Sequence, residues 1–100
     1  MSVYMIASYD VTNPEKYEQY IYAADPVMEK YNGEILVADD EAKNLEGKSS
    51  RTNVVIKFIS EADAMGFYND PEYTSIKHLR LESTENNIVT LSREFSLVEE

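Results

Sequence analysis

The chain has 100 residues, a formal net charge of −10 at pH 7 and no cysteine. This length predicts one domain with one core, because a chain of about 100 residues buries roughly two-thirds of its surface. The acidic excess would repel a phosphate backbone or an anionic membrane surface, and the lack of cysteine excludes disulfides and thiolate chemistry.

The first half of the chain predicts a strand and a helix interrupted by proline. Val3 to Tyr9 is rich in β-forming residues and carries apolar side chains on both faces. Thr12 or Asn13 caps the helix that follows. Pro26 removes a helical hydrogen bond, so we expect two short helices, the second capped by Asp25. Their apolar stripe consists of Tyr17, Tyr20, Ile21, Ala24, Val27, Met28 and Tyr31.

The middle of the chain predicts two strands joined by a polar loop. Asn32-Gly33 supplies the left-handed residue that ends the first helical region, and Glu34 to Ala38 forms the second strand. The segment from Asp39 to Ser50 is polar and predicts a long loop. Asn53 to Ile59 is the third strand, again apolar on both faces.

The last part predicts a second broken helix and a long final strand. Ser60, with Asp63 three residues later, approximates a capping box. Asp70-Pro71 then divides the helix. Asn86-Asn87 predicts a turn before a strand over Ile88 to Val98, whose buried face would run from Val89 to Leu97.

This order predicts an α+β fold, a single ferredoxin-like β-α-β-β-α-β domain over residues 1–100, with a four-stranded antiparallel sheet and two proline-broken helices. Helices cover only one face of such a sheet, although its strands are apolar on both. The second face would expose an unusually large apolar patch of Tyr4, Ile6, Leu36, Val55 and Ile59. We therefore predict a homodimer whose sheets pack face to face as a sandwich or closed barrel.

Several motifs between about Val3 and Ile88 occur together in one known family. They are Tyr9-Asp10-Val11-Thr12-Asn13-Pro14-Glu15, Pro26, Gly33, Leu45-Glu46-Gly47, Asn53-Val54-Val55-Ile56-Lys57-Phe58, Ala64, Tyr68-Asn69-Asp70-Pro71-Glu72-Tyr73, Ile76-Lys77 and Leu79-Arg80. The combination resembles the DUF1330 family of the dimeric α/β-barrel superfamily. The resemblance implies a ferredoxin-like fold, a dimer and a cavity between helices and sheet, but it supplies no reaction.

The sequence offers little of the usual catalytic machinery. The sequence contains neither a glycine-rich nucleotide-binding loop nor a nucleophile elbow. Asp39-Asp40-Glu41 is interpreted as a solvated acidic turn, and we expect no metal and no cofactor. His78, the only histidine, lies off the apolar stripe. We interpret it as a solvated or dimer-edge residue, with acid–base chemistry or ligand binding as the alternative.

The eight tyrosines are the informative excess in this composition. A buried tyrosine adds apolar area and one hydroxyl that needs a partner, which suits a core and equally a pocket for a flat organic ligand. The ligand-pocket candidates are Tyr9, Tyr20, Tyr68, Tyr73, His78 and Arg80. Glu46, Gly47 and Glu72 are interpreted as a structural motif. We favour an ion pair between Arg80 and either Glu46 or Glu72. Alternatively, Arg80 is free in a cavity to bind an anionic or enolate oxygen.

Three functions remain open from the sequence. The leading hypothesis is a cytoplasmic homodimer of unassigned activity that holds a small organic ligand between helices and sheet, without nucleic acid or membrane as partner. The resemblance also permits a cofactor-independent monooxygenase- or isomerase-like enzyme acting on a small aromatic substrate. The third is a stress or interaction protein with a filled core. A cavity of ~300 Å³ or more with two converging polar groups would favour the first two, and a histidine or arginine inside it would favour an enzyme.

Overall fold

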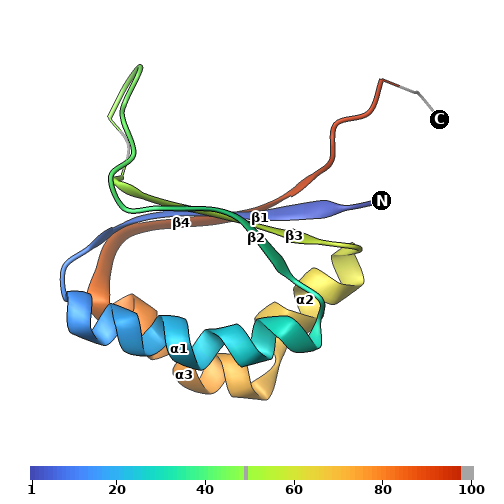
Figure 1. Cartoon of the computed structure of the whole chain (residues 1–100), viewed down its shortest axis with the longest axis horizontal. Coiled ribbons are helices and arrows are strands. Elements are labelled where there is room, and N and C mark those ends of the chain that lie inside the picture. The colour runs from blue at the N-terminus through green and yellow to red at the C-terminus, as the bar shows by residue number, and fades with distance from the viewer. Residues whose placement is uncertain (49, 98–100) are drawn as a thin grey trace.

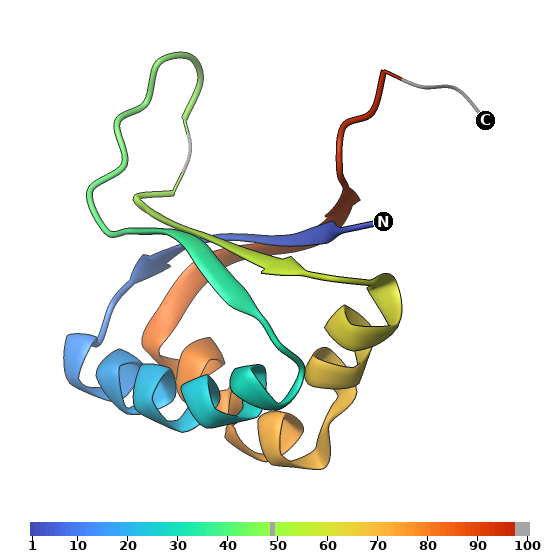
Figure 2. The same ribbon diagram turned by 45° about the vertical axis from the view of Figure 1, so that its right-hand side comes forward.

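The computed structural model describes residues 1–48 and 50–97 and has the predicted ferredoxin-like order of elements. That order is β1 (Val3–Val11), α1 (Pro14–Lys30), β2 (Glu34–Asp39), β3 (Thr52–Phe58), α2 (Glu61–Asn69), α3 (Pro71–Ser83) and β4 (Thr84–Arg93). The strands form one antiparallel sheet in the order β2-β3-β1-β4. The helices lie against one face, and the β2–β3 loop and the segment after β4 project from the other side (Figure 1, Figure 2).

The helix α1 is continuous, so the prediction that it divides at Asp25-Pro26 is wrong. The carbonyl that Pro26 leaves without a helical donor belongs to Tyr22, whose side chain is 73% exposed. Water can replace the missing bond there, so the helix does not have to end. The next two residues, Val27 and Met28, are buried and hold the last turn against the core.

The second helical region is broken where the sequence predicted, which makes three helices in the described chain. Ser60 begins α2 by accepting a hydrogen bond from the Asp63 N–H at 3.1 Å. Asp70 ends α2 and begins α3, where its carboxylate accepts from the Glu72 N–H at 2.8 Å. Pro71 occupies the first turn of α3, where its missing N–H has no helical partner to lose.

The strand β4 begins at Thr84, four residues earlier than predicted, and ends at Arg93; Val98 lies outside the described residues. The pair Asn86-Asn87 is therefore inside the strand. Asn86 has a φ of 58°, and the register against β1 shifts beside it. These features define a β-bulge, and asparagine suits positive φ in a bulge as well as in a turn.

The predicted buried face of the final strand is correct only in part. Val89 and Leu91 are half-buried and pack against the core. Phe95 and Leu97 lie beyond the end of the strand and are 82% and 86% exposed. A period-two pattern gives the direction of each side chain but not the point at which the sheet ends.

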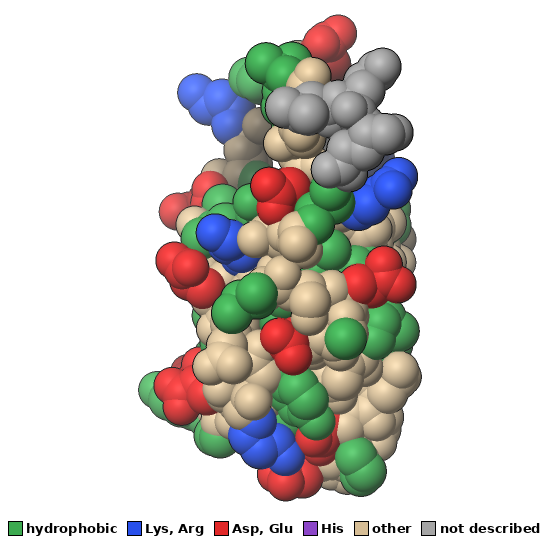
Figure 3. All heavy atoms as spheres, turned by 90° about the vertical axis from the view of Figure 1, so that its right-hand side faces the viewer, with side chains coloured by type: hydrophobic (Ala, Val, Ile, Leu, Met, Phe, Trp, Pro, Cys, Tyr) green, Lys and Arg blue, Asp and Glu red, His purple; other side chains and the backbone are tan. Residues whose placement is uncertain are grey.

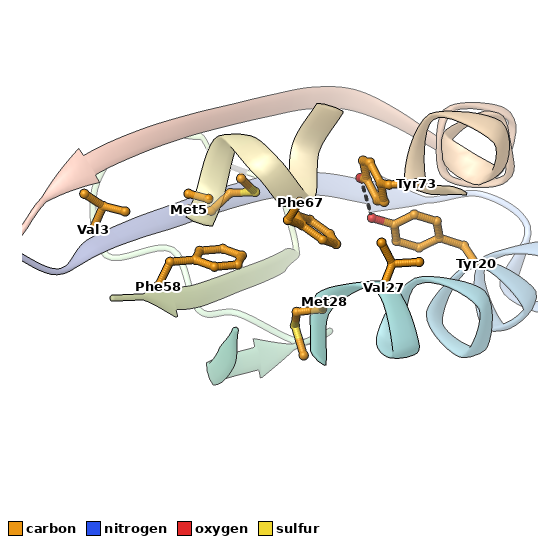
Figure 4. Packing of buried hydrophobic residues seen from close by; sticks show 9 residues of the cluster. Val3, Met5, Tyr20, Val27, Met28, Phe58, Phe67 and Tyr73 are labelled. Carbon is orange, nitrogen blue, oxygen red and sulfur yellow. Dashed lines mark hydrogen bonds between the residues drawn. The ribbon is translucent and has the colours of Figure 1, made fainter. Parts of the chain in front are cut away.

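The core fills the space between the helices and one face of the sheet (Figure 4). Phe58 of β3 is fully buried, and its ring centre lies 5.7 Å from that of Phe67 in α2. Phe67 in turn lies 4.5 Å from Tyr73 of α3. The cluster comprises Val3, Met5, Tyr20, Val27, Met28, Phe58, Ala64, Phe67 and Tyr73. Aromatic contacts thus join α2 and, through it, α3 to the sheet.

The opposite face of the sheet is not covered by helices, as predicted (Figure 1). The register places Ile6 opposite Val55 on one side and Thr90 on the other. We call the apolar part of this surface the open sheet face; its members are Tyr4, Ile6, Leu36, Val37, Val55 and Ile88. Ile6, Leu36, Val37 and Ile88 are exposed, whereas their neighbours half-bury Tyr4 and Val55.

The surface at the end that carries both termini and α2 has no single dominant character. Hydrophobic side chains there are dispersed among acidic and basic ones (Figure 3). Within the part of the chain that is described, no helix combines the length and hydrophobicity needed to cross a bilayer.

Candidate functional site

A cavity of about 90 Å³ lies between the sheet and the helices. Its lining residues come from every strand and every helix described above. Exposed Ile21, Asp25 and Ile35 place its mouth between α1 and β2, whereas Tyr9 and Arg80 are buried at the inner end. The other lining residues are Met5, Ala7, Tyr20, Ala24, Met28, Val54, Ile56, Phe67, Tyr68, Tyr73 and Val89.

Five of the six predicted pocket residues line this one cavity: Tyr9, Tyr20, Tyr68, Tyr73 and Arg80. The sixth, His78, is exposed on α3 and is not part of the lining. The helical period explains the difference, because Tyr73 and Arg80 are seven residues apart and share one face of α3, whereas His78 points away from it. Their role toward a ligand remains a prediction.

Two hydroxyl pairs organise the tyrosines. The hydroxyl oxygens of Tyr20 and Tyr73 are 2.8 Å apart, which joins α1 to α3 (Figure 4). Those of Tyr9 and Tyr17 are 2.7 Å apart and join β1 to α1. Each hydroxyl has one proton, and each pair uses one of its two protons in the mutual bond. Each pair therefore retains one proton that it can donate elsewhere.

Burial keeps the phenols of Tyr9 and Tyr20 neutral. It raises the pKa of Tyr9 and Tyr20 far above the usual value near 10, and their bonded partners Tyr17 and Tyr73 raise it further. The charge on Arg80 opposes the shift but does not cancel it. A phenol with a raised pKa is a poor general base at neutral pH. The cluster can therefore donate hydrogen bonds but cannot readily remove a proton from a ligand.

The cation at the inner end of the cavity is Arg80, which is only 4% exposed. Its Nη1 donates to Oδ1 of Asn87. Asn87 Nδ2 donates to Thr84 Oγ1 at 2.9 Å, and the Thr84 hydroxyl donates back to the Arg80 carbonyl at 2.6 Å. The rings of Tyr9 and Tyr20 lie 5.9 and 6.0 Å from Cζ, within cation–π range. This closed set of bonds fixes the guanidinium in one orientation.

The predicted pairing of Arg80 with Glu46 or Glu72 is wrong. Glu72 instead pairs with Lys30 at 3.0 Å, and Glu46 is exposed in the β2–β3 loop beside Gly47, whose φ is 72°. Among the ion pairs of residues 1–48 and 50–97, none includes Arg80. Burial lowers the pKa of Arg80, but Tyr73 and Tyr20 outweigh it and raise the pKa overall. Within the described part of the chain, the guanidinium is therefore a buried charge without a carboxylate partner.

Sequence reasoning missed the residues that position Arg80. Thr84 follows it by four residues, which is a recognisable spacing for a bond to the carbonyl at a helix end. Asn87 gave no such signal, because the bulge in β4 determines where its side chain points. Asp10 supports that bulge by accepting from Asn86 Nδ2 and from the Arg51 N–H, both at 3.0 Å.

A second polar cluster fixes α1 against α3. The carboxylate of Asp70 accepts from the Tyr31 hydroxyl at 2.6 Å and lies 3.0 Å from the ammonium of Lys30. The Tyr31 hydroxyl, the Glu72 N–H and Lys30, in that order, lower the pKa of Asp70 to about 2. The carboxylate is therefore ionised near neutral pH and sets the start of α3, the helix that carries Tyr73 and Arg80.

The sheet, the helices on one face and the cavity between them define a protein of the ferredoxin-like class, and solved structures share this fold. A protein of unknown function from Rhodopseudomonas palustris superposes with a TM-score of 0.81 at 16% identity, over 95% of this chain and 83% of its own. A dimeric ferredoxin-like protein of unknown function from Jannaschia sp. CCS1 has a TM-score of 0.77 at 10% identity, over 94% and 100%. Another, from Thermobifida fusca YX, has a TM-score of 0.63 at 17% identity, over 91% and 89%.

The chain belongs to the DUF1330 family, described as a domain of unknown function, whose sequence profile matches residues 2–93. The resemblance carried by the sequence motifs is thereby confirmed. No curated protein matches the chain.

Proposed function

We propose that the protein is a homodimer that holds a small organic ligand in the cavity between helices and sheet. The observation that carries the ligand is the convergence of Arg80 and the tyrosine hydroxyls on one otherwise apolar space. A few placed polar groups in an apolar pocket are typical of small-molecule sites. They can orient a ligand while the apolar lining removes it from water.

The size of the cavity restricts this ligand. At about 90 Å³ the cavity is below the ~300 Å³ expected of a ligand site. The criterion of converging polar groups is met and the criterion of volume is not, which favours a small ligand over a large aromatic compound.

A substitution that fills the cavity with a larger side chain distinguishes ligand binding from a purely structural role. Ala24 lines the cavity and Ala62 is exposed on α2. We expect native mass spectrometry of gently purified protein to detect a bound small molecule, which Ala24→Leu displaces and Ala62→Leu retains. A folded wild-type protein without bound mass, or equal retention by both variants, would favour the interaction protein with a filled core.

The open sheet face supports the dimer. Its exposed members Ile6, Leu36, Val37 and Ile88 are apolar, and a second copy would cover them about a two-fold axis. The structures from Jannaschia sp. CCS1 and Thermobifida fusca YX are described as dimeric. A face-to-face sandwich of the two sheets would remove the patch from water.

Sedimentation measures this assembly directly. We expect a species near twice 11.5 kDa at micromolar concentration. Ile6→Asp should dissociate it by placing a charge between the sheets. Leu81→Asp adds the same charge at a side chain of α3 that is 51% exposed and should leave the assembly unchanged. A wild-type monomer, or a dimer that tolerates the Ile6 change, contradicts the proposal.

One observation also favours the enzyme: an arginine lies in the cavity with neutral phenols that can donate to a developing oxyanion. An isomerase- or monooxygenase-like activity would convert a small carbonyl compound without a cofactor. Incubation with such compounds under air and under argon, followed by NMR, tests this. Unchanged spectra of compounds that bind in the cavity would assign the site to binding alone.

A further inference from the structure

We infer that the ligand is a small monocarboxylate whose carboxylate binds Arg80 at the inner end of the cavity, an assignment that rests on the proposed function and adds the chemical class. The buried charge is the first support. Arg80 is 4% exposed, and no ion pair of the described residues includes it. Buried charges are normally paired, and a guanidinium presents parallel donors that match a carboxylate.

The neighbours of Arg80 stabilise it with dipoles and leave the counter-charge to a ligand. Asn87 accepts one of its five N–H donors through an uncharged amide oxygen. The uncharged hydroxyls of Tyr73 and Tyr20 also hydrogen-bond to the guanidinium, and the ring faces of Tyr9 and Tyr20 lie within cation–π range. Each hydroxyl pair also keeps one spare proton. The inner end of the cavity therefore has an excess of donors, which favours an anionic acceptor over a neutral or cationic group.

The volume and the apolar wall limit the rest of the ligand. The cavity of about 90 Å³ is well below the ~300 Å³ at which pockets for drug-sized ligands begin, which favours a compact ligand. Ala7, Val54 and Val89 offer such a ligand short apolar contacts. With the carboxylate at the inner end, the remainder of the ligand is a short aliphatic chain that points toward the mouth.

The mouth selects against a second negative charge. Asp25 is exposed at the rim on α1. An anionic group at the outer end of the ligand would be repelled by the carboxylate of Asp25, whereas an aliphatic end would not be repelled. The cavity therefore favours a monocarboxylate over a dicarboxylate of similar length.

Two pairs of nearly isosteric probes test the charges in the wild-type protein. Ligand-observed NMR titration compares propionate with propionamide, and succinate with its monoamide, succinamate. We expect propionate to bind roughly ten- to a hundredfold more tightly than propionamide, since a hydrogen bond to a charged group is the stronger one. We expect succinate to bind more weakly than succinamate, which has the same size and one negative charge fewer. Equal affinity for acid and amide would overturn the assignment.

Variants then locate the carboxylate. Asn87→Asp gives Arg80 an internal counter-charge while leaving it in place, and should abolish the preference for propionate over propionamide. Gln19→Glu adds the same charge at an exposed position of α1 and should preserve it. Arg80→Met should reduce propionate affinity to that of propionamide. If Arg80→Met does not fold, Asn87→Asp still decides the result, and an undiminished preference in Asn87→Asp places the carboxylate elsewhere.

The outcomes distinguish this assignment from the proposed function. If amides bind as tightly as acids and Ala24→Leu abolishes the binding of both, the cavity is a ligand site that does not select a carboxylate. The proposed function would then hold and the assignment would fail. Absence of binding by acids and amides in folded wild-type protein, together with no co-purified molecule, would refute both. Binding of propionate that Ala24→Leu leaves unchanged would place it outside the cavity and refute the assignment.

Discussion

The buried hydroxyl pair of Tyr20 and Tyr73 makes a quantitative prediction about the core. Tyr20→Phe removes one oxygen and leaves the hydroxyl of Tyr73 without the partner that it has at 2.8 Å. An unsatisfied buried hydroxyl costs roughly 1–3 kcal/mol. We expect Tyr20→Phe and Tyr73→Phe each to lower the free energy of unfolding by about that amount. The double variant should lose much less than the sum, because it leaves neither hydroxyl without its partner.

The assay is urea unfolding of the four proteins of this double-mutant cycle at one protomer concentration, since association makes stability concentration-dependent. Each kcal/mol corresponds to about 4–8 °C in the midpoint of thermal unfolding for a domain of this length. The control is Tyr22→Phe, because that side chain is 73% exposed and should change stability by less than about 0.5 kcal/mol.

Additive losses would refute the reasoning. Additivity within about 0.5 kcal/mol would mean that the two hydroxyls do not depend on each other. Neutral single variants would mean that cavity water or Arg80 satisfies the remaining hydroxyl. In either case the tyrosines would not be the fixed donors that the proposed carboxylate site requires.

Three further predictions concern pH and packing. The folded pKa of Asp70, about 2, lies below the unfolded value of about 3.9, so its stabilising effect is complete above about pH 4 and is lost as pH falls toward 2. Acid unfolding of Asp70→Asn should show a smaller slope in that window, and an equal slope contradicts the assignment. In a spectrophotometric titration below pH 11, Tyr20→Phe should leave the tyrosinate signal unchanged, because burial raises the pKa of Tyr20, and a reduced signal would contradict this. Stability should accordingly fall as pH rises above about 10. Gly66→Ala would place Cβ 2.7 Å from the Tyr31 ring, so we expect a net loss of about 1 kcal/mol in urea unfolding despite better helix propensity, and a gain would show that the ring moves freely.

Local rules predicted the helix boundaries well where the signal lies in neighbouring residues. The caps at Asn13, Ser60 and Asp70 each accept a bond from an N–H two or three residues ahead. Asn32, with a φ of 57°, follows the end of α1 as the left-handed residue that was predicted. These features depend on the backbone within one turn, so the sequence contains most of the information that sets them.

Predictions that depended on distant residues were less accurate. Pro26 is a helix breaker by local rules, but it is tolerated because the carbonyl it affects belongs to Tyr22, an exposed residue of α1. Asn86 reads as a turn, and only the pairing with β1 makes it a bulge. The partner of Arg80 was sought among the acidic side chains, whereas the bulge brings the amide of Asn87 to it.

The sequence by itself determined the order of elements, the family and the presence of strands that are apolar on both faces, because hydrophobic period and local capping act within a few residues. The tertiary structure alone decided that Tyr9, Tyr20, Tyr73 and Arg80 meet at one cavity while His78 faces solvent. It also decided that Arg80 has no carboxylate partner among the described residues. The physical reason is that charge compensation and cavity volume depend on how side chains from different elements fill one space, which no local pattern encodes.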